Sequence, residues 1–153
     1  TGLDPNADWL DYARAHSSPA LNWVAGDARA LPFADARFDH VLSIAALCFV
    51  DDERQAVAEC VRVARRRFAI GWLNRASLLY RQKGRDGGSG AYRGARWHTA
   101  GEVRALFSGL PVREARMAEF TQMARESVEK QRAIEQADTL SFDDYLQRYF
   151  AQS

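Results

Sequence analysis

The sequence predicts a doubly wound α/β fold built on a mostly parallel sheet. Short strand-like segments alternate with helix-like segments over residues 1–120, as they do when crossover helices join parallel strands. The segment 38–44 ends in a continuous apolar run, which suits a strand covered on both faces. With 153 residues, 47% of them hydrophobic, the chain is long and apolar enough for one packed core.

The first elements follow from local signals. Residues 1–4 have the pattern of a strand end, and Asn6 is suited to cap the helix that follows. That helix is predicted to end at residues 17–19, because the proline there disfavours helical geometry in the residue before it. A second strand is predicted at residues 21–24, stopping at Gly26.

The middle of the chain predicts a strand, a helix and another strand. After a polar loop at residues 27–37 comes the strand 38–44, and the acids at 51–53 favour a helix N-terminus. Arg65, Arg66 and Arg67 are predicted to close this helix, where cations complement the helix dipole. The apolar stripe expected to bury the helix is Ala56, Val57, Cys60, Val61 and Ala64.

The remaining elements are less regular. Five glycines at residues 84–94 predict a mobile loop on the substrate side. From residue 122 onwards the chain has a helical, charged pattern. The other predicted elements are a strand at 68–73, a helix at 75–83, a helix from Thr99 to about Gly109 and a strand at 112–120.

Composition excludes several classes of protein. No apolar run is long enough to span a membrane, and Cys48 and Cys60 are too few and too isolated for a disulfide scaffold or a zinc site. Two free thiols suit the reducing cytoplasm, where we expect the protein to reside. Residues 61–117 hold thirteen bases and three acids, which we interpret as a solvated arginine-rich face. Nucleic-acid binding is disfavoured because stacking aromatics do not alternate with these arginines.

Two acids follow consecutive predicted strands. Ligands of open α/β sheets lie outside the carboxyl ends of the strands, where Asp4 and Asp27 are expected. A carboxylate there can accept both hydroxyls of a ribose, and a second one can accept an exocyclic amine of a base. Taken singly, each acid is also ordinary turn chemistry. As a pair, they predict a nucleoside-like ligand.

Residues 2–14 and 26–43 resemble class I S-adenosylmethionine-dependent methyltransferases. The second block is the more specific, because it combines an acid, Leu-Pro-Phe and Phe-Asp ahead of an apolar strand. The resemblance covers residues 1 to about 120 and implies a Rossmann-like fold that transfers a methyl group from S-adenosylmethionine to a small-molecule acceptor. The implied cofactor contacts are Asp4 for the ribose, Pro5 beside the adenine, Asp27 for the adenine amine, Ala28 through its N–H, and Ile44 and Ala45 along the methionine moiety.

The sequence departs from that family in three places. The glycine-rich loop that follows the family's first strand is expected before Thr1, so we predict a domain incomplete at its N-terminus. Many relatives carry histidine where Cys48 stands. Residues 121–153 are predicted as a separate helical tail, and residues 124–146 resemble the C-terminal tail of proteobacterial glutamate–cysteine ligases.

His98 is the best candidate for a catalytic base, because it opens a helix after the glycine-rich stretch. Methyl transfer depends mainly on alignment, so a base is needed only where the acceptor must lose a proton. Two other functions stay open at this point. One is a nicotinamide-dependent oxidoreductase with the same ribose acid, and the other is a non-catalytic remnant or interaction module.

Overall fold

The computed structural model describes residues 1–114 and 116–117. The chain divides into two units, Thr1–Ala115 and Arg116–Ser153, and the elements below belong to the first. The predicted tail helices and the glutamate–cysteine ligase resemblance lie outside the described residues. Within them, no helix is long and apolar enough to cross a membrane.

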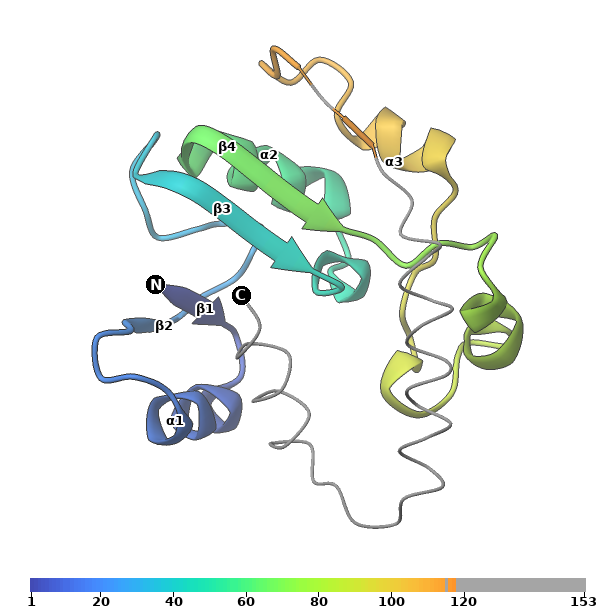
Figure 1. The fold of residues 1–153 in the computed structure, drawn as a ribbon, viewed down its shortest axis with the longest axis horizontal. Coiled ribbons are helices and arrows are strands. Elements are labelled where there is room, and N and C mark those ends of the chain that lie inside the picture. The colour runs from blue at the N-terminus through green and yellow to red at the C-terminus, as the bar shows by residue number, and fades with distance from the viewer. Residues whose placement is uncertain (115, 118–153) are drawn as a thin grey trace, which may run out of the picture. The chain divides into compact units, whose positions relative to one another are not determined.

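The N-terminal part is a parallel strand–helix–strand unit. Strand β1 (Gly2–Asp4) leads into helix α1 (Ala7–His16), which returns to strand β2 (Trp23–Ala25) (Figure 1). Asn6 caps α1 as predicted, since its side chain accepts hydrogen bonds from two backbone N–H groups of the first turn. The second strand begins two residues later than the sequence pattern indicates.

The next unit repeats this arrangement with longer strands. Strand β3 (Phe38–Ile44) is followed by the short 3₁₀ helix η1 (Leu47–Phe49), helix α2 (Glu53–Val63) and strand β4 (Ala64–Gly71), which pairs with β3 in parallel. Helix α2 lies against one face of this pair (Figure 1). The core there consists of Leu47, Ala56, Val57 and Cys60, with Val41, Ile70 and Trp72 packed against it.

The position predicted for the three arginines is wrong. Helix α2 ends at Val63, and residues 65–67 lie in β4 with exposed side chains. Cations at a helix end gain only about 0.3–1 kcal/mol from the dipole, whereas the strand forms a hydrogen-bonded ladder with β3. Arg65 also reaches Asp39 on β3, with 2.6 Å between Nη2 and Oδ1.

An excursion of the chain, residues 74–98, separates β4 from helix α3 (Ala100–Leu106). The helix predicted at 75–83 is displaced, because its main turn is a π-helix at Tyr80–Gly84. The glycine-rich stretch folds back on itself through backbone hydrogen bonds such as Gly94 N to Gly87 O, 2.9 Å. Thr99 caps α3 in a capping box with Glu102. Residues 112–114 and 116–117 of the last predicted strand are not a strand in the structure.

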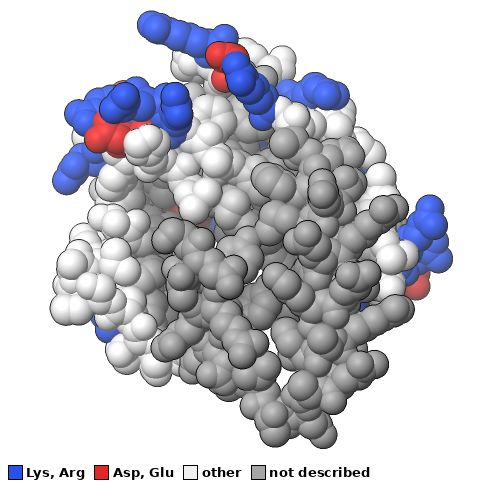
Figure 2. Space-filling view, in the orientation of Figure 1, with Lys and Arg blue, Asp and Glu red and all other residues white. Residues whose placement is uncertain are grey.

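The strands form two separate pairs rather than one hydrogen-bonded sheet. Strand β1 pairs with β2, and β3 pairs with β4. The face of β3 opposite α2 is open, since Leu42 is 72% exposed and Ile44 is 63% exposed. In Figure 2, the Lys and Arg side chains that can be seen stand in separate groups at the margin of the view.

Candidate functional site

The two acids predicted to share a ligand lie on neighbouring strands. Asp4 closes β1 opposite Ala25 of β2, and Gly26 N donates to Asp4 O at 3.2 Å. Asp27 therefore follows β2 directly beside the end of β1. This placement agrees with the position expected for a ligand at the carboxyl ends of parallel strands.

The two carboxylates have different surroundings. Asp4 Oδ1 accepts from Asn6 N at 2.8 Å, which fixes the carboxylate at the start of α1. Asp27 is held by Arg29, whose Nη2 lies 2.6 Å from Oδ2 and whose backbone N donates to Oδ1 at 2.8 Å. Hydrogen bonds from Arg29 hold the pKa of Asp27 below its ordinary value. A ligand amine at Asp27 thus has to share the carboxylate with Arg29 or displace its side chain.

The chain bends sharply where β3 ends. Ala45 has a φ of 51°, in the left-handed region that residues other than glycine seldom adopt, and its N–H donates to Gly71 O at 3.0 Å. Strained backbone of this kind gathers at ligand sites. Of the two predicted methionine contacts, Ile44 is exposed at this strand end, whereas Ala45 is half-buried and packs against the cluster of Cys48, Leu73 and Trp97.

Pro5 and Ala28 occupy different environments. Pro5 is exposed at the start of α1. Ala28 is half-buried, and its side chain packs against the core under α2. The packing of Ala28 and the bond from Gln55 Nε2 to Arg29 O, 3.2 Å, fix the loop after β2 to α2.

Cys48 is buried in η1, where its thiol donates to Ala45 O at 3.1 Å. Burial raises the pKa of Cys48, and it raises the pKa of Cys60 to about 11. Because the thiolate is the reactive form, both cysteines are expected to react with iodoacetamide much more slowly in the folded protein than in urea. Mass spectrometry of timed samples measures the two rates. Equal rates with and without urea contradict the burial of these thiols.

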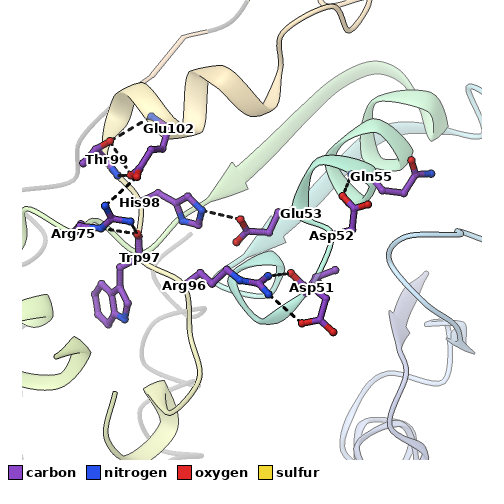
Figure 3. A network of polar contacts seen from close by, with 11 residues as sticks. Asp51, Asp52, Glu53, Gln55, Arg75, Arg96, Trp97, His98, Thr99 and Glu102 are labelled. Carbon is purple, nitrogen blue, oxygen red and sulfur yellow. Dashed lines mark hydrogen bonds and ion pairs between the residues drawn. The ribbon is translucent and has the colours of Figure 1, made fainter. Parts of the chain in front are cut away.

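His98 is nine-tenths buried and pairs with Glu53, an acid whose position in the sequence indicates only the start of a helix. Its Nε2 lies 2.8 Å from Oε2 of Glu53, the first residue of α2 (Figure 3). Backbone bonds from His98 N to Leu73 O, 2.9 Å, and from Arg75 N to His98 O, 2.9 Å, hold it beside the chain that leaves β4. The structure therefore brings His98 to the end of the β3–β4 strand pair where Ala45 also lies.

Glu53 had no distinguishing signal in the sequence. Three acids in a row at residues 51–53 are ordinary helix-start chemistry, and 45 positions separate Glu53 from His98. Trp72 was likewise missed, although its ring centroid lies 4.9 Å from that of His98. Within the described residues, no group of three or more His, Cys, Asp or Glu side chains is arranged to hold a metal ion.

The chain is similar to known methyltransferases over much of its described part. Residues 1–67 match the methyltransferase domain family. A SAM-dependent methyltransferase from Thermotoga maritima superimposes with a TM-score of 0.60 and 28% identity, over 69% of this chain and 51% of that protein. Over residues 1–67, the chain is therefore similar to part of a methyltransferase domain. The predicted resemblance to class I methyltransferases and the predicted Rossmann-like α/β fold are confirmed.

Curated methyltransferases also match part of this chain. The phthiotriol/phenolphthiotriol dimycocerosates methyltransferase of Mycobacterium tuberculosis is 42% identical over 66 residues, which are 42% of this chain and 24% of the relative. The fatty-acid O-methyltransferase of Mycolicibacterium smegmatis is 47% identical over 45 residues, 29% of this chain and 16% of the relative. The chain thus spans about a quarter or less of the length of these curated relatives.

Proposed function

We propose that this protein takes part in S-adenosylmethionine-dependent methyl transfer to a small-molecule acceptor. The observation that carries the proposal is the pair Asp4 and Asp27, which lies at the carboxyl ends of neighbouring parallel strands inside the methyltransferase segment. Two carboxylates so placed fit a ribose diol and an adenine amine. When bound, the cofactor supplies an electrophilic methyl group on a sulfonium.

The residues that would hold the cofactor come from three strand ends. Asp4 and Pro5 follow β1, Asp27 and Ala28 follow β2, and the bend at residues 44–45 follows β3. The exposed Ile44 leaves apolar surface accessible there, which suits contact with the methionine moiety of the cofactor. Because methyl transfer needs alignment above all, rigid strand ends are suitable supports for this site.

The acceptor is proposed to be small and partly apolar. The names of the two relatives above refer to dimycocerosates and to a fatty acid as acceptors. In this chain, large hydrophobic side chains are exposed in the segments that follow β3 and β4, namely Phe49, Leu78 and Leu79. We place the protein in the cytoplasm on its two free cysteines, and we propose neither nucleic acid nor membrane as a partner.

Calorimetry on the full chain with S-adenosylmethionine and its demethylated product, S-adenosylhomocysteine, tests the proposal. Asp4→Ala is expected to weaken binding about 10- to 100-fold, because a hydrogen bond to a charged group contributes about 1.5–3 kcal/mol. Asp4→Asn keeps an acceptor for Asn6 N and separates the loss of charge from the loss of the turn. Asp27→Ala is expected to weaken binding as well.

Asp11→Ala is the matched control, since Asp11 is exposed on α1 and pairs only with Arg14 among the described residues. It is expected to bind as the unchanged protein does. Absence of heat from the unchanged chain at millimolar cofactor contradicts the proposed function.

A further inference from the structure

Buried polar atoms without a partner gather where the chain leaves β4. Among the described residues, four buried side-chain atoms lack a hydrogen bond, namely Glu53 Oε1, Trp72 Nε1, Trp97 Nε1 and His98 Nδ1. Glu53, His98 and Trp72 form a continuous group, because Glu53 bonds to His98 and the ring of His98 contacts that of Trp72. Buried polar atoms in folded proteins are nearly always bonded, so this group is suited to a polar ligand.

The hydrogen-bond roles of the three side chains define that ligand. An ionised Glu53 only accepts, so Nε2 of His98 carries the proton in their 2.8 Å contact. In the neutral imidazole, Nδ1 is then an acceptor, as is Glu53 Oε1, whereas the Trp72 indole N–H only donates. A hydroxyl group both donates and accepts. A hydroxyl group can therefore bond to any one of these three atoms.

The other charged groups around the pair are already engaged (Figure 3). On one side, Arg96 donates to Val50 O and pairs with Asp51, 3.1 Å between Nη2 and Oδ1. On the other, Arg75 donates to Trp97 O and pairs with Glu102. Asp52 accepts from Gln55 N at 3.0 Å. Glu53 is thus the carboxylate that faces His98, and its charge is available to balance an imidazolium.

We propose that Glu53 and His98 form a proton-accepting pair for an acceptor that carries a hydroxyl group. This proposal rests on the proposed function. The acceptor's O–H bond breaks as its oxygen bonds to the transferred methyl carbon, and the proton passes to His98 Nδ1. The methyl carbon–sulfur bond breaks with its electron pair left on sulfur. His98 is the catalytic base, and Glu53 is a positioning residue that fixes the tautomer and stabilises the imidazolium.

The first test needs no methyl transfer. Nitrogen NMR of the imidazole rings in the full chain, with His98 assigned from His98→Gln, is expected to show the Nε2–H tautomer. Glu53→Ala is expected to yield a mixture of tautomers, whereas Asp51→Asn, the loss of a neighbouring acid, leaves the tautomer unchanged. Octylphenol, an apolar molecule with one hydroxyl, is expected to shift the Nδ1 resonance. No shift, or an unchanged tautomer in Glu53→Ala, overturns the proposal.

The second test compares octylphenol with dodecanoate as methyl acceptors. The phenol loses a proton on methylation, whereas the carboxylate has none to lose. Glu53→Gln and His98→Gln are expected to lower kcat for octylphenol about 100-fold or more and to leave dodecanoate within about twofold. Equal losses on both acceptors indicate a structural role and overturn the proposal.

Failure of the proposed function and failure of the Glu53–His98 proposal give different results. A chain that binds no S-adenosylhomocysteine in calorimetry contradicts methyl transfer itself, whatever the state of His98. If the chain binds the cofactor but methylates neither acceptor, and octylphenol does not shift the Nδ1 resonance, only the proposed role of Glu53 and His98 is contradicted.

Discussion

Replacing Val57 by aspartate is expected to unfold the β3–α2–β4 unit. Val57 is 0% exposed in the core beneath α2, and the described residues of that cluster are hydrophobic, so none of them can pair with a new carboxylate. An unpaired buried charge costs several kcal/mol, a large part of the roughly 5–15 kcal/mol that stabilises an ordinary domain. Circular dichroism during heating measures the effect, and we expect no cooperative transition in Val57→Asp.

The matched control is the same change at Leu42. This residue lies on β3, on the face opposite α2, and is 72% exposed. A carboxylate at Leu42 stays in water, so Leu42→Asp is expected to melt close to the unchanged protein. If Leu42→Asp is as damaging as Val57→Asp, the face that carries Leu42 and Ile44 is buried in the folded protein, contrary to the structure.

Removing the Glu59 carboxylate is expected to destabilise the loop before β3. Glu59 on α2 accepts from Leu31 N at 2.7 Å and from Arg62 at 2.6 Å, and its side chain is mostly buried. Glu59→Ala is expected to lower the free energy of unfolding by about 2 kcal/mol, because it removes charged hydrogen bonds and leaves Leu31 N without its partner. Glu59→Gln retains an acceptor and is expected to lose less. Urea unfolding followed by tryptophan fluorescence measures both.

The same carboxylate makes stability depend on pH. Hydrogen bonds from Arg62 hold the pKa of Glu59 below its ordinary value. A group whose pKa is lowered by folding contributes stability above its unfolded pKa, about 4.3, and that contribution is lost as the pH falls through the folded pKa. The urea midpoint is therefore expected to fall on acidification below about pH 4, less steeply in Glu59→Gln. Parallel curves for the two proteins contradict a role for the Glu59 charge.

Local signals predicted those elements whose cause lies within a few residues. The side chain of Asn6 and the pairing of Thr99 with Glu102 begin helices at the expected positions. The apolar strand 38–44 is also where it was predicted. Residues 65–67 were placed wrongly because their conformation is decided by pairing with β3, a partner more than twenty residues away.

The candidate site divides in the same way. Asp4 and Asp27 could be predicted as neighbours because consecutive parallel strands bring their carboxyl ends together. The contact of Asp27 with Arg29 was not predicted, since it depends on side-chain orientation in the loop. The partnership of Glu53 with His98 could not be read from sequence, because it requires the excursion at 74–98 to return to the start of α2.

That excursion has a consequence for how the protein can diversify. Its two ends are joined where Asn74 bridges His98, so changes in its outer part need not be transmitted to the base of the loop. Around Gly87 and Gly90 an added Cβ would meet nothing within 4 Å, although the left-handed backbone there still favours glycine. Insertions and deletions near these glycines can therefore change the tip of the excursion while the Glu53–His98 geometry is kept. Under the proposed function, acceptor range and proton transfer are separable in evolution, because sequence changes at the tip of the excursion can affect the first without disturbing the second.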